Sequence, residues 1–303
     1  MTRVLVTGGA GFIGSHVVDA LLARGDDVVV LDDLSSGSRA NLDPRATLVV
    51  GDIASAAGAA LVPGRLDAVL HFASKTKVTE SMDKPDLYRR VIFEGTANVL
   101  ALAEDRGAGV FVNISSGGAG YGETPVNATE ETRMNASSPY GRLKVEAETL
   151  LLPSPIRTVT LRLANVYGPR QRRDLEGGVV AIFQERWGSR QPLIVYGDGS
   201  AERDYVYVGD IVDAAVAAMV GPSASGPYNI GTGVATSVSA LIARMSLLLG
   251  RPAGVEHASA RAGEIQRSCL DPAKAARDGL WTPRVSLAEG LRRTLTAGSP
   301  PPG

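Results

Sequence analysis

Short runs of aliphatic residues alternate with longer segments of helical periodicity along the first half of the chain. The six apolar runs cover residues 4–7, 28–31, 48–50, 67–71, 110–114 and 159–163. Strands that are apolar on both faces and separated by helices are typical of a parallel sheet covered by helices on both sides. The pattern therefore predicts an α/β fold with a Rossmann-type doubly wound parallel sheet. In such a fold the functional residues lie at the carboxyl ends of the strands.

The pattern changes after about Tyr167, where glycine and proline interrupt shorter segments. A further apolar run at residues 228–230 could return a strand to the main sheet. We therefore predict a main domain over residues 1–167 and about 204–233. A smaller C-terminal region, over about 168–203 and 234–303, is expected to pack at the carboxyl edge of the sheet and to bind the substrate.

The composition narrows the possible functions. Thirty-one Lys and Arg residues against 32 Asp and Glu residues give a net charge of −1, which provides no attraction to a nucleic-acid backbone. One cysteine, Cys269, and three histidines far apart in the sequence predict neither a disulfide framework nor a metal site. The chain has no long apolar run and no signal-peptide pattern, so we expect a cytoplasmic protein without a membrane partner.

A glycine-rich turn lies directly between the first predicted strand and the first predicted helix. Gly8, Gly11 and Gly14 form the pattern Gly-x-x-Gly-x-x-Gly. The first glycine permits a tight turn, the second lets the backbone approach a pyrophosphate, and the third allows the helix to pack closely on the strand. The helix N-terminus adds unpaired N–H groups and about +0.5 of an elementary charge. The turn therefore predicts a dinucleotide site.

Two aspartates follow the next two strands. A carboxylate at Asp32 can accept hydrogen bonds from a ribose diol and repels a 2′-phosphate, which favours NAD over NADP. Asp52 is placed to border the adenine. For both residues, capping of a turn is the structural alternative.

Tyr140 and Lys144 lie four residues apart at the start of an amphipathic helix, and therefore on one helix face. A tyrosine hydroxyl has a pKa of about 10, which a nearby ammonium group lowers. Such a phenol can remove the proton of a sugar hydroxyl while hydride leaves for NAD. The alternative is a solvated pair on the helix surface.

These motifs resemble those of the extended short-chain dehydrogenase/reductases, and most closely those of the nucleotide-sugar 4-epimerases similar to UDP-glucose 4-epimerase. The resemblance rests on residues 7–14, 31–34, 71–73, 115–122, 138–144 and 165–170, and extends over about residues 3–290. It implies bound NAD, a UDP-sugar substrate and a homodimer. It also assigns the main domain to NAD and the smaller region to the nucleotide sugar.

The family's functional positions can be transferred to this sequence. The resemblance implies contacts with NAD by Gly8, Gly11, Phe12, Ile13, Gly14, Asp32, Asp33, Leu34, Ser36, Gly37, Asp52, Ile53, Phe72, Ala73, Ser74, Tyr140, Lys144 and Leu163. It implies contacts with the UDP-sugar by Thr76, Ser116, Gly117, Asn165, Arg172, Val179, Leu193, Val195, Tyr196, Arg203, Arg261 and Glu264.

The chain departs from the family pattern where a catalytic Ser or Thr usually precedes the Tyr-Gly pair, because this position is Gly117. Ser116 is the expected substitute, Ser115 is the fallback, and a strand-end cap is the alternative role. The neighbouring positions, Gly118 and Ala119, carry neither the acidic pair of the dehydratases nor the glutamate of the decarboxylases. Simple oxidation and reduction at C4, in a roomy sugar pocket, is therefore expected.

Arg172 provides the prediction about the sugar. Residues 168–172 resemble the Gly-Pro-Arg-Gln-Arg segment of UDP-glucuronate 4-epimerases, in which the second arginine faces the sugar carboxylate. A buried carboxylate needs a paired cation. The sequence therefore favours epimerisation of UDP-glucuronate to UDP-galacturonate. The alternatives are a UDP-glucose 4-epimerase, a UDP-glucuronate decarboxylase or 4-keto reductase, and a non-enzymatic NAD-binding sensor.

Overall fold

The computed structural model describes residues 1–174, 178–221, 224–260 and 263–297. Its main sheet has seven parallel strands in the order β10-β6-β5-β4-β1-β2-β3. These strands are β1 (Arg3–Thr7), β2 (Asp27–Asp32), β3 (Thr47–Val50), β4 (Ala68–His71), β5 (Val110–Ser116), β6 (Arg157–Leu163) and β10 (Gly226–Ile230). The order reverses between β1 and β4, so the predicted Rossmann-type fold class is confirmed.

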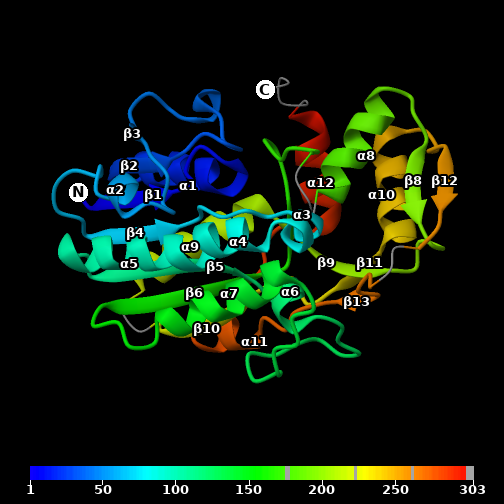
Figure 1. Ribbon diagram of the computed structural model, residues 1–303. Helices are drawn as coiled ribbons and strands as arrows, with labels where there is room; N and C mark the ends of the chain where they lie inside the picture. The colour runs from blue at the N-terminus through cyan, green and yellow to red at the C-terminus, as the bar shows by residue number, and fades with distance from the viewer. Residues whose placement is uncertain (175–177, 222–223, 261–262, 298–303) are drawn as a thin grey trace.

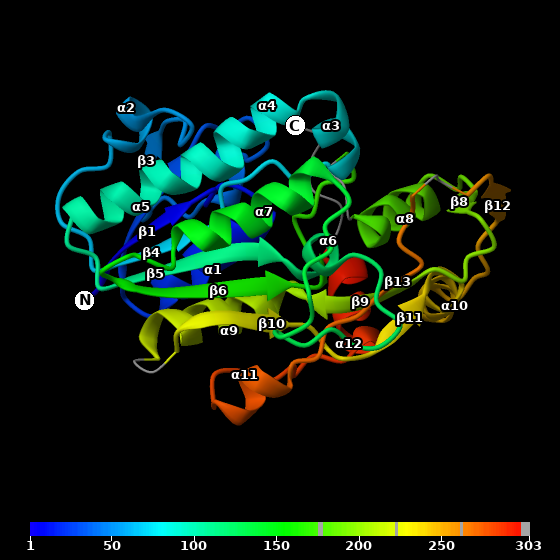
Figure 2. The ribbon, with the colours of Figure 1, turned by 60° about the horizontal axis from the view of Figure 1, so that its bottom comes forward.

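Helices cover both faces of this sheet because alternate residues of each strand point to opposite sides. Val4 and Val6 face α1 (Phe12–Ala23) and α9 (Val208–Val220), whereas Leu5 faces α5 (Gly95–Asp105). Figure 2 shows α5 and α7 (Pro139–Leu150) on one side of the sheet and α9 on the other. The shorter elements are η1 (Arg39–Asn41), α2 (Ala56–Ala59), α3 (Val78–Asp83), α4 (Pro85–Tyr88), the π-helical turn η2 (Arg89–Glu94), α6 (Gly117–Tyr121) and α11 (Ala273–Arg277).

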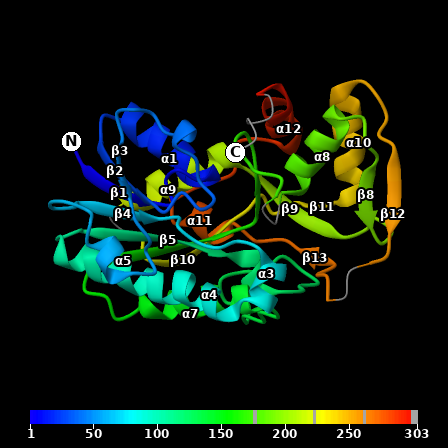
Figure 3. The same ribbon diagram turned by 45° about the horizontal axis from the view of Figure 1, so that its top comes forward.

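A smaller region lies at one end of the main sheet (Figures 1 and 3). Its larger sheet is built around β9 (Glu202–Tyr207), which pairs with β7 (Asn165–Tyr167), β11 (Ala235–Ser237) and β13 (Arg267–Ser268). A second pair is formed by β8 (Leu193–Tyr196) and β12 (Val255–Ala258). Helices α8 (Val179–Gly188), α10 (Val238–Leu249) and α12 (Leu287–Thr296) share the core of this region.

The chain crosses between the two regions more than once. Strands β7 and β9 belong to the sheet of the smaller region, whereas α9 and β10, which follow β9, return to the main sheet. The division at about residues 167, 204 and 233 stays a prediction about domains. Among the residues that the structure describes, no helix is long and apolar enough to cross a membrane.

Candidate active site

The glycine turn holds the loop after β1 against the loop after β4. Gly8 has a φ of +67°, and its N–H donates to the Leu31 carbonyl at 2.9 Å. A Cβ at Gly8 would lie 2.6 Å from the Ala73 nitrogen, and one at Gly14 would lie 2.3 Å from the Gly8 oxygen. Because both contacts are with backbone atoms, a side chain at either position would force the backbone segments apart. The predicted residues Phe72 and Ala73 are therefore held directly beside the turn.

The N-terminus of α1 fits an anionic group. Gly11 is the N-cap residue and provides no side-chain cap, whereas serines 138, 237 and 286 cap α7, α10 and α12. The first N–H groups of a helix have no partner within the helix. A Cβ at Gly11 would meet only the Gly8 oxygen, at 3.2 Å, so the approach to these donors is open. The arrangement suits the pyrophosphate of NAD at residues 11–14.

Asp32 ends β2 and is 6% exposed. Its two oxygens accept the N–H groups of Ala10 and Leu34, each at 2.9 Å. Burial raises the pKa of this carboxyl group, and the two hydrogen bonds oppose the rise. The carboxylate thus supports the glycine turn, as the capping alternative predicted. Its remaining lone pairs can still accept the hydroxyls of a ribose.

The loop after Asp32 covers the glycine turn. Leu34 has a φ of 59°, and a Cβ at Gly37 would lie 2.8 Å from the Ala10 carbonyl carbon. The residues after β3 contribute less to the predicted NAD site. Asp52 is exposed and accepts the Ala54 N–H at 2.9 Å, as a turn cap does, and Ile53 is buried in the core beneath α5.

His71 links the glycine turn to α5 through buried hydrogen bonds. Its Nδ1 lies 2.7 Å from the Thr7 hydroxyl, and its Nε2 lies 3.0 Å from the Thr96 hydroxyl. Thr96 donates to the Ile92 carbonyl, so its oxygen accepts from Nε2–H, and Nδ1 accepts from Thr7. Burial lowers the pKa of His71 to about 3, and the Lys144 charge adds to the shift. The sequence signal for this link was a histidine at the end of a buried strand, but no role was predicted for His71 from the sequence.

The neutral His71 predicts acid sensitivity. The unfolded chain binds a proton at this residue below its ordinary pKa of 6.5, and the folded chain binds one only near a pKa of about 3. Stability is therefore complete above pH 6.5 and falls as the pH decreases toward 3. At pH 5 we expect a loss of about 2 kcal/mol from this residue. Urea unfolding of wild type and His71→Gln at pH 7 and pH 5 measures it.

The variant is expected to lose less stability between the two pH values than the wild type. His257→Gln is the control, because His257 is exposed and lies on β12. His16 also has a lowered pKa, but it is present in all three proteins. Equal losses in wild type and His71→Gln would contradict the prediction.

The predicted Tyr140 and Lys144 pair lies at the start of α7. The Ser138 hydroxyl caps the helix by accepting the Gly141 N–H at 3.1 Å, and the Tyr140 N–H donates to the Ser81 hydroxyl of α3 at 3.2 Å. Lys144 is 8% exposed, and its Nζ donates to the Ile114 carbonyl at 2.8 Å. Burial lowers the pKa of Lys144 to about 8, while the charge of Glu148 opposes the shift. Such burial excludes a solvated surface pair.

Ser116 caps α6, which makes an unusually close contact with α7, the helix that carries this pair. A Cβ at Gly141 would lie 2.3 Å from the Ala119 oxygen, so only glycine at this position lets the two helix starts meet. The Ser116 hydroxyl accepts the Ala119 N–H at 3.3 Å as the cap of α6, and its proton remains available for another acceptor. Ser115 donates to Glu148 at 2.6 Å instead, which leaves Ser116 as the better candidate.

The space for the sugar that was expected beside Gly117 and Gly118 is filled by other side chains. A Cβ at Gly117 would lie 2.6 Å from the Leu270 side chain, and one at Gly118 would lie 3.0 Å from the Ser268 hydroxyl. Gly117 therefore packs against the segment that follows β13. The substrate contact that the sequence suggested for Gly117 has no support in this geometry.

The residues predicted for the nucleotide sugar are divided between a surface and a core. Arg203 and Glu264 approach each other to 3.9 Å, and both side chains are partly exposed. Asn165 lies on β7, Val179 begins α8, and Tyr196 is exposed at the end of β8. By contrast, the side chains of Leu193 and Val195 point into the core of the smaller region.

Arg261 lies outside the described residues. Three further predicted residues lie at the ends of main-sheet strands: Thr76 is exposed in the loop after β4, Ser74 lies in the same loop, and Leu163 ends β6.

Arg172 does not extend toward a sugar site in this structure. Its guanidinium group donates to both oxygens of Asp174, at 2.9 and 2.8 Å, and to the Ser36 carbonyl at 3.1 Å. Ser36 belongs to the loop that covers the glycine turn, where the family resemblance places NAD. The two carboxylate contacts already neutralise the charge that was predicted to meet a uronate.

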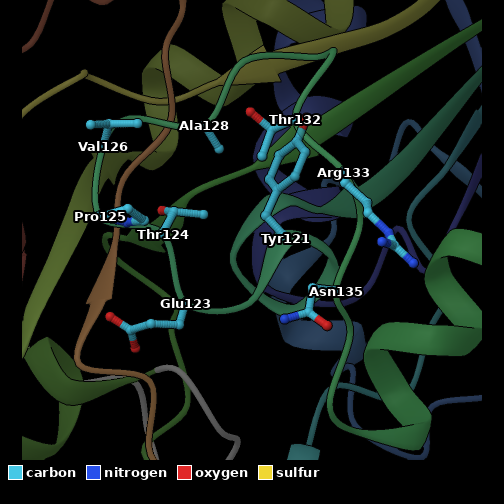
Figure 4. Close-up of a pocket in the computed structure, with 9 residues that line it drawn as sticks. All are labelled: Tyr121, Glu123, Thr124, Pro125, Val126, Ala128, Thr132, Arg133 and Asn135. Atoms are coloured by element: carbon cyan, nitrogen blue, oxygen red, sulfur yellow. The ribbon is translucent and has the colours of Figure 1, made fainter.

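A cavity of about 470 Å³ lies next to α6, and none of the predicted site residues lines it. Figure 4 shows Tyr121, Thr132, Arg133 and Asn135 around it. The Tyr121 hydroxyl is already engaged, since it accepts from Arg162 and donates to Asn229. Among the described residues, no group of three or more His, Cys, Asp or Glu side chains could hold a metal ion.

Comparison with known proteins identifies the family of the chain. Residues 4–231 match the NAD dependent epimerase/dehydratase family. The chain is 40% identical to a UDP-glucose 4-epimerase of Mycolicibacterium smegmatis, over 97% of both chains. It is similar to the crystal structure of a UDP-glucose 4-epimerase from Thermotoga maritima with UDP-glucose (TM-score 0.91, 37% identity, 97% of both chains). It is also similar to a Thermus thermophilus UDP-glucose 4-epimerase in complex with NAD (TM-score 0.91, 38% identity, 97% and 98% of the two chains). The predicted family resemblance is thus confirmed, and the chain is an enzyme that belongs to the NAD-dependent epimerase/dehydratase family.

Proposed function

We propose that the protein catalyses the reversible C4 epimerisation of a UDP-hexose with bound NAD. The observation that carries the proposal is the buried Lys144 ammonium one helical turn from Tyr140, on a helix that contacts the turn capped by Ser116. The uncapped start of α1 and the Asp32 carboxylate lie at the same carboxyl edge of the sheet. The family and the similarity to UDP-glucose 4-epimerases support the same reaction.

Each side chain has a separate task in the reaction. NAD, when bound, supplies the reversible oxidation of a carbon that carries a hydroxyl group. Tyr140 accepts the proton of the sugar O4 as a general base and later returns it to the same oxygen. The Lys144 ammonium stabilises the phenolate, and the Ser116 hydroxyl donates a hydrogen bond to O4. Arg203 binds the diphosphate, so that the 4-keto sugar can turn over about its phosphate linkage.

We infer that the hexose is neutral, in contrast to the uronate that the sequence favoured. The Arg172 fork is held by Asp174 and Ser36, and this supports glucose or galactose over glucuronate. The similar epimerases support the same choice. Two further expectations, a homodimer and a cytoplasmic location, stay predictions.

Incubation with single UDP-sugars tests the proposal. Without added NAD, we expect UDP-glucose and UDP-galactose to interconvert, with slower or no reaction of UDP-glucuronate. Anion-exchange chromatography separates and measures UDP-glucose, UDP-galactose, UDP-glucuronate and UDP-galacturonate. Pentose products would indicate decarboxylation, and inactivity on the whole panel with NAD still bound would reject the epimerase.

The variant Arg172→Ala tests whether the enzyme recognises the carboxylate of a uronate. Because the guanidinium group is engaged by Asp174 and Ser36, we expect the ratio of kcat/KM for UDP-glucose and UDP-glucuronate to change less than about threefold, as for a partly exposed ion pair. The matched control is Arg173→Ala, whose guanidinium pairs with Glu185 on α8. A selective loss of UDP-glucuronate turnover in Arg172→Ala would restore carboxylate recognition.

A further inference from the structure

A buried polar cluster lies directly behind Lys144. We define the Glu148 cluster as Ser115, Tyr121, Glu148 and Arg162. Glu148 follows Lys144 by one helical turn, so the two side chains share one face of α7. Arg162 of β6 donates from Nε and Nη2 to the same Glu148 oxygen, at 3.0 and 2.7 Å. Both side chains are nearly buried, with 10% of Arg162 and 12% of Glu148 exposed.

The cluster connects the elements that carry the proposed catalytic residues. Ser115 donates to Glu148 at 2.6 Å, and its neighbour Ile114 accepts the hydrogen bond of Lys144 at 2.8 Å. These contacts cross-link α7 to β5 at two successive turns. Arg162 also donates to the Tyr121 hydroxyl at 2.7 Å, at the end of the short helix that Ser116 begins. The position of Glu148 is therefore tied to β5, β6 and α6.

The charges in this part of the interior are few and closely coupled. The titratable groups that interact with Lys144 are His71 of β4 and Glu148 on its own helix. His71 is neutral because its burial lowers its pKa to about 3. Glu148 raises the pKa of Lys144 and so favours the charged ammonium, against the effect of burial. The charge on Lys144 therefore depends on a carboxylate whose position is fixed by Arg162.

We propose that Glu148, clamped by Arg162 and Ser115, is a positioning residue that keeps the Lys144 ammonium charged and aimed at the Tyr140 end of α7. The inference rests on the proposed epimerase function, because this function gives Lys144 its task. Arg162 is suited to the clamp because its planar fork reaches two acceptors with fixed geometry, which a lysine cannot do. The sequence signal was a glutamate four residues after Lys144, on the same helix face.

The acidity of Lys144 can be measured without a substrate. The chain has five lysines, so NMR of protein labelled at the lysine Cε gives five signals, and Lys144→Met identifies the relevant one. Since the pKa of Lys144 is lowered to about 8, we expect its signal to titrate near pH 8 in the wild type. In E148Q its midpoint should fall by about one pH unit or more, because an opposite charge is lost. In R162M it should also fall, by less than in E148Q, because the Glu148 carboxylate is still present but is no longer held by Arg162.

The matched control is E146Q on the same helix, since Glu146 is half-exposed and pairs with Arg89 at the surface. Its Lys144 midpoint should equal that of the wild type. A purely structural role of the pair would lower stability in both E148Q and R162M without lowering the Lys144 midpoint in either. If a single remaining buried charge prevents folding, E148M/R162M removes both charges, and its Lys144 midpoint should fall as in E148Q because the carboxylate is absent. An unchanged Lys144 midpoint in E148Q, or in the double variant, would overturn the proposal.

The catalytic consequence is measured separately. E148Q should lower kcat for UDP-hexose epimerisation by about tenfold or more with little change in KM, because the lost charge acts on Tyr140 and not on binding. A wild-type enzyme that is inactive on every UDP-sugar would reject the proposed function. The NMR titration would still decide whether Glu148 controls Lys144.

Discussion

Replacement of Tyr140 by phenylalanine is expected to lower the rate of C4 epimerisation by about 10²- to 10⁴-fold, because the general base is lost. The phenyl ring can occupy the same partly buried place, packed against the hydrophobic cluster that includes Leu143 and Ala147 of α7. NAD should therefore stay bound, and the loss should appear in kcat. Coupled-assay kinetics with UDP-galactose, together with the NAD content of the purified protein, measure both quantities.

The matched control for this variant is Tyr228→Phe. Tyr228 also makes a hydrogen bond, to Asp278, but it lies on β10, on the far side of β6 from β5. Its removal should leave the rate within about threefold of wild type, since it costs one partly exposed hydrogen bond. Turnover by Tyr140→Phe at a comparable rate would show that another group moves the proton.

Gly8→Ala is expected to abolish or strongly weaken NAD binding. At a φ of +67°, an alanine is strained by about 1–2 kcal/mol. Its Cβ would also lie 2.6 Å from the Ala73 nitrogen and 2.9 Å from the Phe72 carbonyl carbon. The loops after β1 and β4 must then separate, which disturbs the turn in front of α1. We expect NAD affinity to fall by at least about tenfold, the equivalent of 1.4 kcal/mol, with a lower Tm.

Isothermal titration with NAD and thermal unfolding test this expectation. Gly188→Ala is the control, because Gly188 ends α8 and no neighbouring atom lies within 4 Å of an added Cβ. This variant should bind NAD as the wild type does. NAD binding by Gly8→Ala with unchanged affinity would mean that the turn is not part of the cofactor site.

The main features of the fold followed from the sequence because they depend on local patterns. Apolar runs separated by helical segments determine a parallel sheet, and the glycine pattern 8-11-14 determines the turn before α1. The spacing of Tyr140 and Lys144 places both side chains on one helix face, whatever the rest of the chain does. The resemblance to the family rests on the same short motifs, and the match over residues 4–231 confirms it.

Long-range packing decided which groups the side chains outside these motifs contact. Gly117 appeared to open the sugar pocket, but Leu270, which follows β13, fills that space. Leu193 and Val195 were predicted to contact the UDP-sugar, yet in the structure β8 pairs with β12 and both side chains lie in the core of the smaller region. Arg172 finds Asp174 and Ser36, and no pattern along the chain predicts which acceptor a guanidinium group on a loop will reach.

The sequence by itself determined the sheet, the nucleotide turn and the Tyr140–Lys144 pair, because each depends on residues close together in the chain. Only the tertiary structure decided the environment in which these residues act. The neutral state of His71 and the clamp of Arg162 on Glu148 join residues from different strands and helices. Their energies come from burial and from charges brought together by folding, and neither is encoded in local spacing.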